Sequence, residues 1–354
     1  MPEPAPATGP LRRFVRLGPR RTDHLPAFRI SLGLAIPLLI LLSTNHVSWA
    51  LYAGFGAFTG IYSRYEPTRD RFRRQGLMAI VLTACVAIGA TLASAGERWD
   101  PSTAPWVTLC ITSLVAGIAA ALVTARDIKP GGALFPLFAV AAVAAAPPAA
   151  PIWIAVLIAA AAAGGSVLLG LAGHWLGEGH PPEGFEPVRH HWMTSQVRAQ
   201  FVRTAIAALL AGAVGLLSGL PFPYWAQIAA IAPLSVPGRS AQVERGLHRV
   251  IGTALGILAT GFLLSFPSEA WQLVIWVILL QFIAELFVLR NYPLALIFIT
   301  PLALLMVQLA HPTPVGELLS ARLLETALGA GVGIGVVSVS ALWDRRRKTS
   351  TAGS

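Results

Sequence analysis

The chain has 354 residues, of which 55% are hydrophobic and only 12% are charged, and its mean hydropathy is +0.67. A soluble domain carries roughly 25% charged residues, so this composition excludes an ordinary water-soluble fold. The net charge of +10 would by itself suggest nucleic-acid binding, but its placement along the chain is explained by membrane topology, and we expect no nucleic-acid partner.

The charge is absent from long blocks, such as residues 50–61 and 76–96. Several blocks approach the roughly 20 residues that cross a bilayer as a helix. They are continuously apolar and do not alternate from side to side, which favours helices over a β-barrel. The sequence therefore predicts an all-α polytopic membrane protein.

Residues 1–26 contain five arginines and no apolar core, so they are not a secretory signal. We predict a basic cytoplasmic tail that contacts anionic lipid headgroups, where each basic residue gains about 1 kcal/mol.

Breaks at proline, glycine and charged residues divide the rest of the chain into about twelve predicted spans, six in each half. The first half, residues 27–176, has spans at 27–43, 47–63, 73–95, 105–125, 131–146 and 151–176. The second half, residues 201–343, has spans at 201–219, 222–238, 247–266, 270–289, 293–310 and 316–342. A cytoplasmic linker, 177–200, joins the halves, and a basic cytoplasmic tail, 344–354, ends the chain.

Nearly all of the 26 lysines and arginines fall at one side of this topology when both termini are placed in the cytoplasm. The loops on the other side carry Glu97, Asp100, Glu269 and Glu317. This asymmetry is what the positive-inside rule predicts, and it indicates a multi-pass protein of the cytoplasmic (plasma) membrane.

The halves resemble tandem repeats. At one constant separation Trp49 matches Trp225, Arg69 matches Arg245, Arg73 matches Arg249, and Gly76 matches Gly252. Six spans per half is an even number, so the repeats share one orientation about an axis along the membrane normal. A monomer that is a pseudo-dimer of halves, or a homodimer, fits this pattern.

The stretch from Arg245 to Gly256, with Arg249, Gly252, Thr253 and Gly256 at its centre, follows the aromatic pair Tyr224-Trp225. With the charged residues Arg322 and Glu325 in the last span, it resembles the fusaric acid resistance (FUSC) family of integral membrane transporters, related to aromatic carboxylic acid exporters. The resemblance implies export of aromatic or other organic carboxylates, with plant malate channels as distant relatives. Larger members carry a cytoplasmic domain, for which the linker 177–200 leaves no room.

The second span of each half, 47–63 and 222–238, is short, and the latter holds three prolines. Short or proline-interrupted segments in corresponding positions of two halves point to the central site of a transporter. A tilted helix packed against its neighbours explains them equally well. Trp49 and Trp225 begin these segments, either as headgroup anchors or, less commonly, as rings that stack on substrate.

Arg69 with Arg73, and Arg245 with Arg249, lie one helical turn apart at the predicted cytoplasmic ends of long spans. Together with helix N-termini they could form an anion-collecting mouth. For a single arginine, positive-inside topology and lipid phosphate contacts are sufficient.

Arg322 and Glu325 lie within the last span, where a charge costs at least about 2.5–3.5 kcal/mol. Their spacing allows a structural ion pair. The alternative hypothesis makes Arg322 a contact for a substrate carboxylate, and Glu325 and Glu285 proton carriers; the only evident partner of Glu285 is Arg290.

The glycines of the last span, among them Gly329 and Gly333, indicate close helix packing and not a nucleotide site, because no phosphate-binding Lys-Ser/Thr follows.

We find no catalytic constellation, no metal-ligand spacing and no cofactor motif, so we expect no enzyme. Three functions remain: a proton-coupled exporter of organic, most simply aromatic, anions; an uncoupled anion channel; or a membrane scaffold without flux.

Overall fold

The computed structural model describes residues 23–178 and 194–352, so most of the predicted first tail and most of the predicted linker lie outside the described residues. Within them the chain is helical, with twelve α-helices and no strand. The all-α prediction is confirmed.

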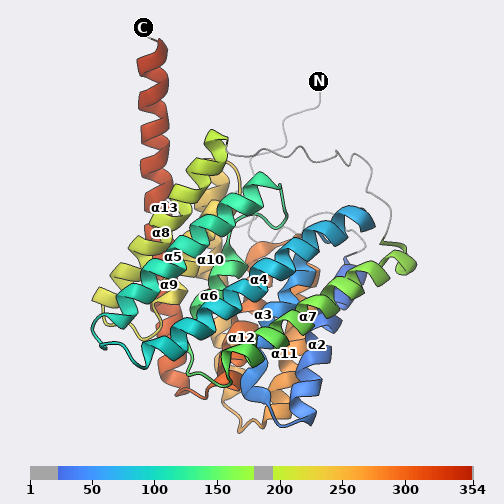
Figure 1. Ribbon diagram of the computed structural model, residues 1–354. Helices are drawn as coiled ribbons and strands as arrows, with labels where there is room; N and C mark the ends of the chain where they lie inside the picture. Colours follow the sequence, from blue (N-terminus) through green and yellow to red (C-terminus); the bar gives the residue numbers. More distant parts are fainter. Residues whose placement is uncertain (1–22, 179–193, 353–354) are drawn as a thin grey trace.

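Nine helices are long and apolar enough to cross a membrane (Figure 1). They are α2 (His24–Ser43), α4 (Thr68–Gly96), α5 (Ala104–Ala125), α7 (Ile152–Ala172), α8 (Ser195–Leu217), α10 (Arg239–Leu264), α11 (Ala270–Phe287), α12 (Tyr292–Ala310) and α13 (Val315–Ala352). The single turns η1 (Val47–Trp49), η2 (Phe58–Ile61), η3 (His174–Glu178) and η4 (Pro233–Ser235) flank the α-helices.

The other three helices are α3 (Ala50–Ala57), α6 (Leu134–Ala145) and α9 (Tyr224–Ile231), with 8, 12 and 8 residues. They lie in the predicted spans 47–63, 131–146 and 222–238. Each falls short of the roughly 20 residues that a crossing needs. The prediction of twelve segments was therefore right in number, but among the described helices nine, not twelve, qualify as membrane spans.

The short helices form the centre of the bundle. Every residue of α3 and of α9 is buried. The long helices surround them and expose large apolar side chains, such as Leu168 on α7 and Leu258 on α10, with exposed fractions of 66% and 71%. An apolar outer surface of this kind fits contact with lipid.

Each short helix packs on a long one: α3 on α7, α6 on α4, and α9 on α13. In the carboxyl-terminal part α10 packs on α12 and α13, as α4 does on α6 and α7. The two parts meet where α5 packs on α8, α2 on α11, α6 on α9, and α3 on α12.

Both α3 and α9 end inside the bundle, and this frees backbone carbonyl groups that need hydrogen-bond donors. Gln75 of α4 donates from Nε2 to the carbonyls of Gly60 and Tyr62, at 3.2 and 2.9 Å. Gln200 of α8 donates in the same way to the carbonyl of Leu234, at 2.9 Å. One buried or half-buried glutamine therefore supports each broken helix.

Glycines allow the closest helix contacts. A Cβ atom on Gly252 would lie 2.8 Å from the carbonyl oxygen of Pro293, and one on Gly256 would lie 2.9 Å from that of Leu296. Only glycine fits at such separations, so the glycine spacing after Arg249 is required by the contact between α10 and α12.

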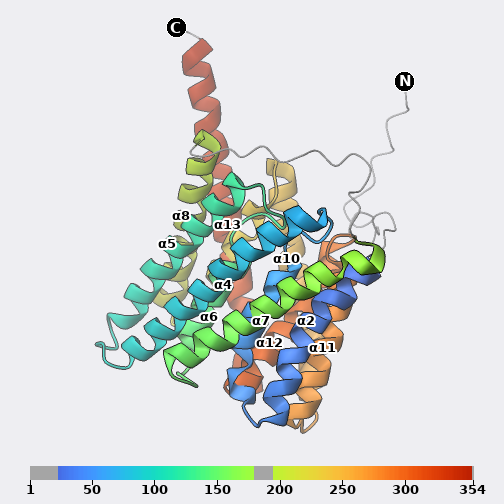
Figure 2. The same ribbon diagram turned by 45° about the vertical axis from the view of Figure 1, so that its right-hand side comes forward.

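The start of α2 and the end of α13 lie towards the same end of the bundle, the upper end in Figures 1 and 2. The connections from α3 to α4, α5 to α6, α9 to α10 and α11 to α12 lie at this end too. These connections carry Arg64, Arg126, Lys129 and Arg290, and we call this end the basic end.

Candidate functional site

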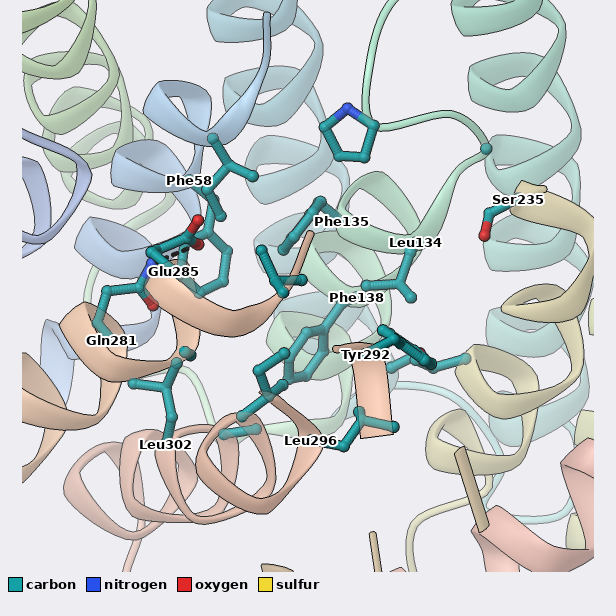
Figure 3. Close-up of a pocket in the computed structure, with 18 of the residues that line it drawn as sticks. Phe58, Leu134, Phe135, Phe138, Ser235, Gln281, Glu285, Tyr292, Leu296 and Leu302 are labelled. Atoms are coloured by element: carbon teal, nitrogen blue, oxygen red, sulfur yellow. Dashed lines mark hydrogen bonds between the residues drawn. The ribbon is translucent and has the colours of Figure 1, made fainter. Parts of the chain in front are cut away.

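A cavity of about 400 Å³ lies between the two parts of the bundle and reaches the connections at the basic end. Its lining comes from α3, α6 and all five helices from α9 to α13, together with the connections that follow α3 and α5. Figure 3 shows Glu285 and Gln281 on one side and Tyr292 and Ser235 on the other, with Phe135 and Phe138 between them.

Aromatic rings form much of the wall. The phenyl ring of Phe138 lies 5.0 Å from that of Phe55 and 4.9 Å from the Trp225 ring, measured between centroids. The ring of Phe135 lies 5.3 Å from Phe58. These separations are those of favourable aromatic pairs, so the rings hold one another in place and present a fixed apolar surface.

Four arginines line the cavity, and Arg64 among them pairs with Glu285. The other three lie beside these rings, and we call them the three cavity arginines: Arg245 and Arg249 from α10, and Arg322 from α13. The guanidinium carbon of Arg322 lies 3.7 Å from the Trp225 ring, and that of Arg245 lies 3.8 Å from the Tyr292 ring. The Nη1 atom of Arg249 donates to the Tyr292 hydroxyl at 3.3 Å. Each arginine is thus held by an aromatic side chain.

None of these three arginines makes an ion pair with a carboxylate in the described part of the chain. The Nε atoms of all three, and Nη1 of Arg322, are buried and lack a hydrogen-bond acceptor there. Arg249 and Arg322 are only 4% and 1% exposed. An aromatic face attracts a cation without neutralising it, so the cavity carries an excess of positive charge.

The possible ion pair between Arg322 and Glu325 is not formed among the described residues. Glu325 is fully buried, and its Oε1 atom accepts a hydrogen bond from the backbone N–H of Phe222 at 2.7 Å. The carboxylate therefore lies just before the start of α9, where the positive end of the helix dipole favours it. Arg322 points to Trp225 instead.

Glu285 has a partner that the sequence did not suggest. Its carboxylate pairs with Arg64, which also donates to the Glu285 backbone carbonyl at 3.2 Å, and Gln281 donates to its other oxygen at 3.0 Å. Arg290, the expected partner, lies 4.0 Å from Asp23. Burial lowers the pKa of Arg64 to about 10, so this side chain is still charged at neutral pH.

The comparisons with known proteins point to the same part of the chain. Residues 207–336 match the fusaric acid resistance protein-like family. The resemblance that the sequence predicted is confirmed over this range, which contains α9, α10, α11 and α12 completely and reaches into α13. It includes all three cavity arginines.

Two curated relatives also match. One is an uncharacterized membrane protein of Bacillus subtilis, 27% identical over 152 residues, which are 43% of this chain and 24% of the relative. The other is an uncharacterized protein of Synechocystis, 28% identical over 136 residues, or 38% of this chain and 18% of the relative. The matched stretches are thus a quarter or less of each relative. No solved structure matches the chain.

Of the two arginine pairs proposed for an anion mouth, the structure brings only Arg245 and Arg249 to the cavity. Arg69 and Arg73 are exposed on α4 and do not line it. The buried face of α4 instead carries Arg71, which shares the carboxylate of Glu178 with Arg29, each at 3.0 Å. The cavity thus receives one of the two predicted pairs, and the anion-collecting mouth itself stays a prediction.

The two predicted tryptophans lie in different surroundings. Trp225 is fully buried between Arg322 and Phe138, so it is not a headgroup anchor. Trp49 is half-buried at the end of the bundle opposite the basic end, and its indole donates to the carbonyl of Ala149 at 3.0 Å.

Sequence reasoning missed Arg64, Tyr292 and the phenylalanines of α6. The length of the predicted span 131–146 was a usable signal for Phe135 and Phe138, because this segment is as short as the two that were singled out. Arg64 gave no such signal, since Glu285, its partner, is far away in the sequence.

Proposed function

We propose that the protein is a secondary transporter that exports organic, most simply aromatic, carboxylate anions across the cytoplasmic membrane through this cavity. The observation that carries the proposal is the set of three arginines, without carboxylate partners among the described residues, against a wall of aromatic rings. The match of residues 207–336 to the fusaric acid resistance protein-like family supports membrane transport as the class of function.

The chemistry of the cavity suits this substrate. A buried guanidinium has lost much of its hydration, so an anion that reaches it gains a charge-assisted hydrogen bond in a site of low dielectric constant. Phe135 and Phe138 offer edges and faces for an aromatic ring. A volume of about 400 Å³ lies within the range of about 300–1,000 Å³ that holds small organic ligands.

Access from one end favours a transporter. The cavity lining includes connections at the basic end, such as Lys129 and Ser235. At the other extreme it ends at Leu51, Gly54 and Met306, and the lining holds no residue from the connections at the opposite end. A cavity that reaches one end only is the arrangement that alternating access requires, and the positive-inside rule supports our assignment of this end to the cytoplasm.

The two tandem six-helix halves supply a moving unit for this mechanism. The proposal is supported by helix pairings that recur with corresponding members: α4 with α6 and α7 against α10 with α12 and α13, and α3 with α7 against α9 with α13. Rocking of one half against the other would open the cavity to the opposite side. A single chain provides both halves, so a monomer is sufficient and a homodimer is compatible.

Two carboxylates are candidates for coupling to protons. Glu285 lines the cavity beside Arg64, and Glu325 lies one turn from Arg322. Both sit next to an arginine, so a substrate anion in the cavity would change the charge around them during transport. We assign them as proton carriers, with Arg322 as the contact for the substrate carboxylate.

The test is flux of benzoate through purified protein in liposomes, with an imposed pH gradient and separately with an imposed voltage. Uphill flux driven by the pH gradient and lost in Glu285→Gln or Glu325→Gln would support the proposal; Glu317→Gln, an exposed position on the helix of Glu325, is the matched control. Downhill flux that follows voltage without coupling would identify a channel. No flux of benzoate or chloride would favour a scaffold.

A further inference from the structure

The three cavity arginines form a continuous series. Arg245 and Arg249 are one helical turn apart on α10, a rise of about 6 Å, and both contact Tyr292. Arg249 is in turn close enough to Arg322 for the two charges to repel each other. The order from the basic end inwards is Arg245, Arg249, Arg322.

The series has two steps, from Arg245 to Arg249 and from Arg249 to Arg322, and each step has its own aromatic partner. Tyr292 lies between Arg245 and Arg249, with its ring against the first and its hydroxyl on the second. Trp225 lies under Arg322. The first step is therefore walled by Tyr292, and the second by Trp225 and the Phe138 ring that packs on it.

Three adjacent cations at this depth repel one another. In the described part of the chain no carboxylate forms an ion pair with them, and Glu325 attracts Arg322 only from beyond ion-pair distance. Glu285 is engaged by Arg64, and Glu325 by the Phe222 backbone. One monovalent anion would compensate at most part of this charge. Two negative charges, one at each step, would place an anion between each adjacent pair of cations.

Building on the proposed function, we propose that the cavity has two carboxylate-binding positions in series that share Arg249. The outer position lies between Arg245 and Arg249 beside Tyr292, and the inner position lies between Arg249 and Arg322 beside Trp225. Two monocarboxylates occupy them in single file, or one aromatic dicarboxylate spans both. When an anion moves from the outer to the inner position, a second anion in the outer position offsets the repulsion between Arg245 and Arg249.

The experiment counts sites on the purified full-length chain in lipid nanodiscs, by equilibrium binding of radiolabelled benzoate and of terephthalate. Wild type is expected to bind two benzoates or one terephthalate. Arg322→Gln and Arg245→Gln should each retain one benzoate. Either change should weaken the affinity for terephthalate by about 10- to 150-fold, which is the range expected when one hydrogen bond to a charged group is lost.

Arg249→Gln should weaken benzoate binding at both positions, because both use this side chain. Arg198→Gln, an exposed arginine of α8, is the matched control and should leave both counts unchanged. Retained affinity in Arg322→Lys, which keeps the charge, would show that a loss in Arg322→Gln is not a failure to fold.

A single benzoate site in wild type, or loss of all binding from each single arginine change, would overturn the two-position proposal while leaving transport intact. A wild-type protein that binds two benzoates but does not transport them would contradict the proposed function and leave the two positions standing. The two failures are thus distinguishable.

Discussion

A substitution at Gly333 tests whether the spacing of α9 and α13 sets the site. A Cβ atom at this position would overlap the carbonyl oxygen of Ala230 and lie 3.0 Å from the Ala230 Cα atom. Non-bonded atoms prefer about 3.5–4.0 Å, so Gly333→Ala must move α13 away from α9 by about 1 Å. Overpacking of this kind costs about 1–3 kcal/mol.

Gly331, on the same helix, is the matched control because a Cβ atom there meets nothing within 4 Å. Gly331→Ala should be neutral, or stabilising by up to about 1 kcal/mol through helix propensity. Because α13 carries Arg322 and α9 carries Trp225, we expect Gly333→Ala also to loosen their contact and reduce benzoate flux. Gly331→Ala should keep full flux.

The assay is the apparent melting midpoint of each purified variant in one detergent, followed by flux in liposomes. We expect a lower midpoint for Gly333→Ala only. Equal shifts in the two variants, or an unchanged Gly333→Ala protein, would show that the tight contact between α9 and α13 is not present in the protein, and would remove the support for the stacked Arg322.

Three further predictions concern other parts of the fold. Arg64→Gln and Glu285→Gln should each destabilise by about 3–5 kcal/mol, because one buried charge is left unpaired, whereas the double variant should recover much of the loss in a denaturation cycle. Gln75→Leu leaves two buried carbonyls after α3 without a donor and should cost about 1–3 kcal/mol for each, measured by the same denaturation assay. Burial lowers the pKa of His311, in the connection after α12, below 6.5, so the unfolded chain binds its proton first and stability should fall as the pH drops below about 6.5. His311→Gln should remove this part of the acid sensitivity in midpoints measured at pH 7.5 and 5.5, while His46→Gln, an exposed position, should not.

Much of the helical pattern could be predicted from the sequence. The spans predicted at 105–125 and 293–310 correspond to Ala104–Ala125 and Tyr292–Ala310. These boundaries follow from charge and from proline and glycine, which act locally. The positions of the helical segments along the chain are therefore encoded in local signals.

Which segments cross the membrane could not be predicted by the same means. A helix enclosed by other helices and a helix facing lipid are both apolar all round, so hydropathy does not separate α3 or α9 from the spans around them. The rotation of α4 was also out of reach: it exposes Arg69 and Arg73 but buries Arg71, two residues away from each. Which side of a helix faces the protein interior is decided by packing partners that are distant in the chain.

The contrast between Arg71 and Arg249 explains why one half of the chain carries the site. Each is a buried arginine in the amino-terminal half of a long helix that packs on two later helices. Arg71 and Arg29 do not line the cavity, and they share Glu178, so one of their two charges is compensated within the protein. Among the described residues Arg249 bonds to the Tyr292 hydroxyl and has no carboxylate partner, so its charge is available to a ligand. A cation attracts a mobile anion most strongly where no fixed carboxylate compensates its charge, so the proposed anion site falls in the range 207–336 that matches the family.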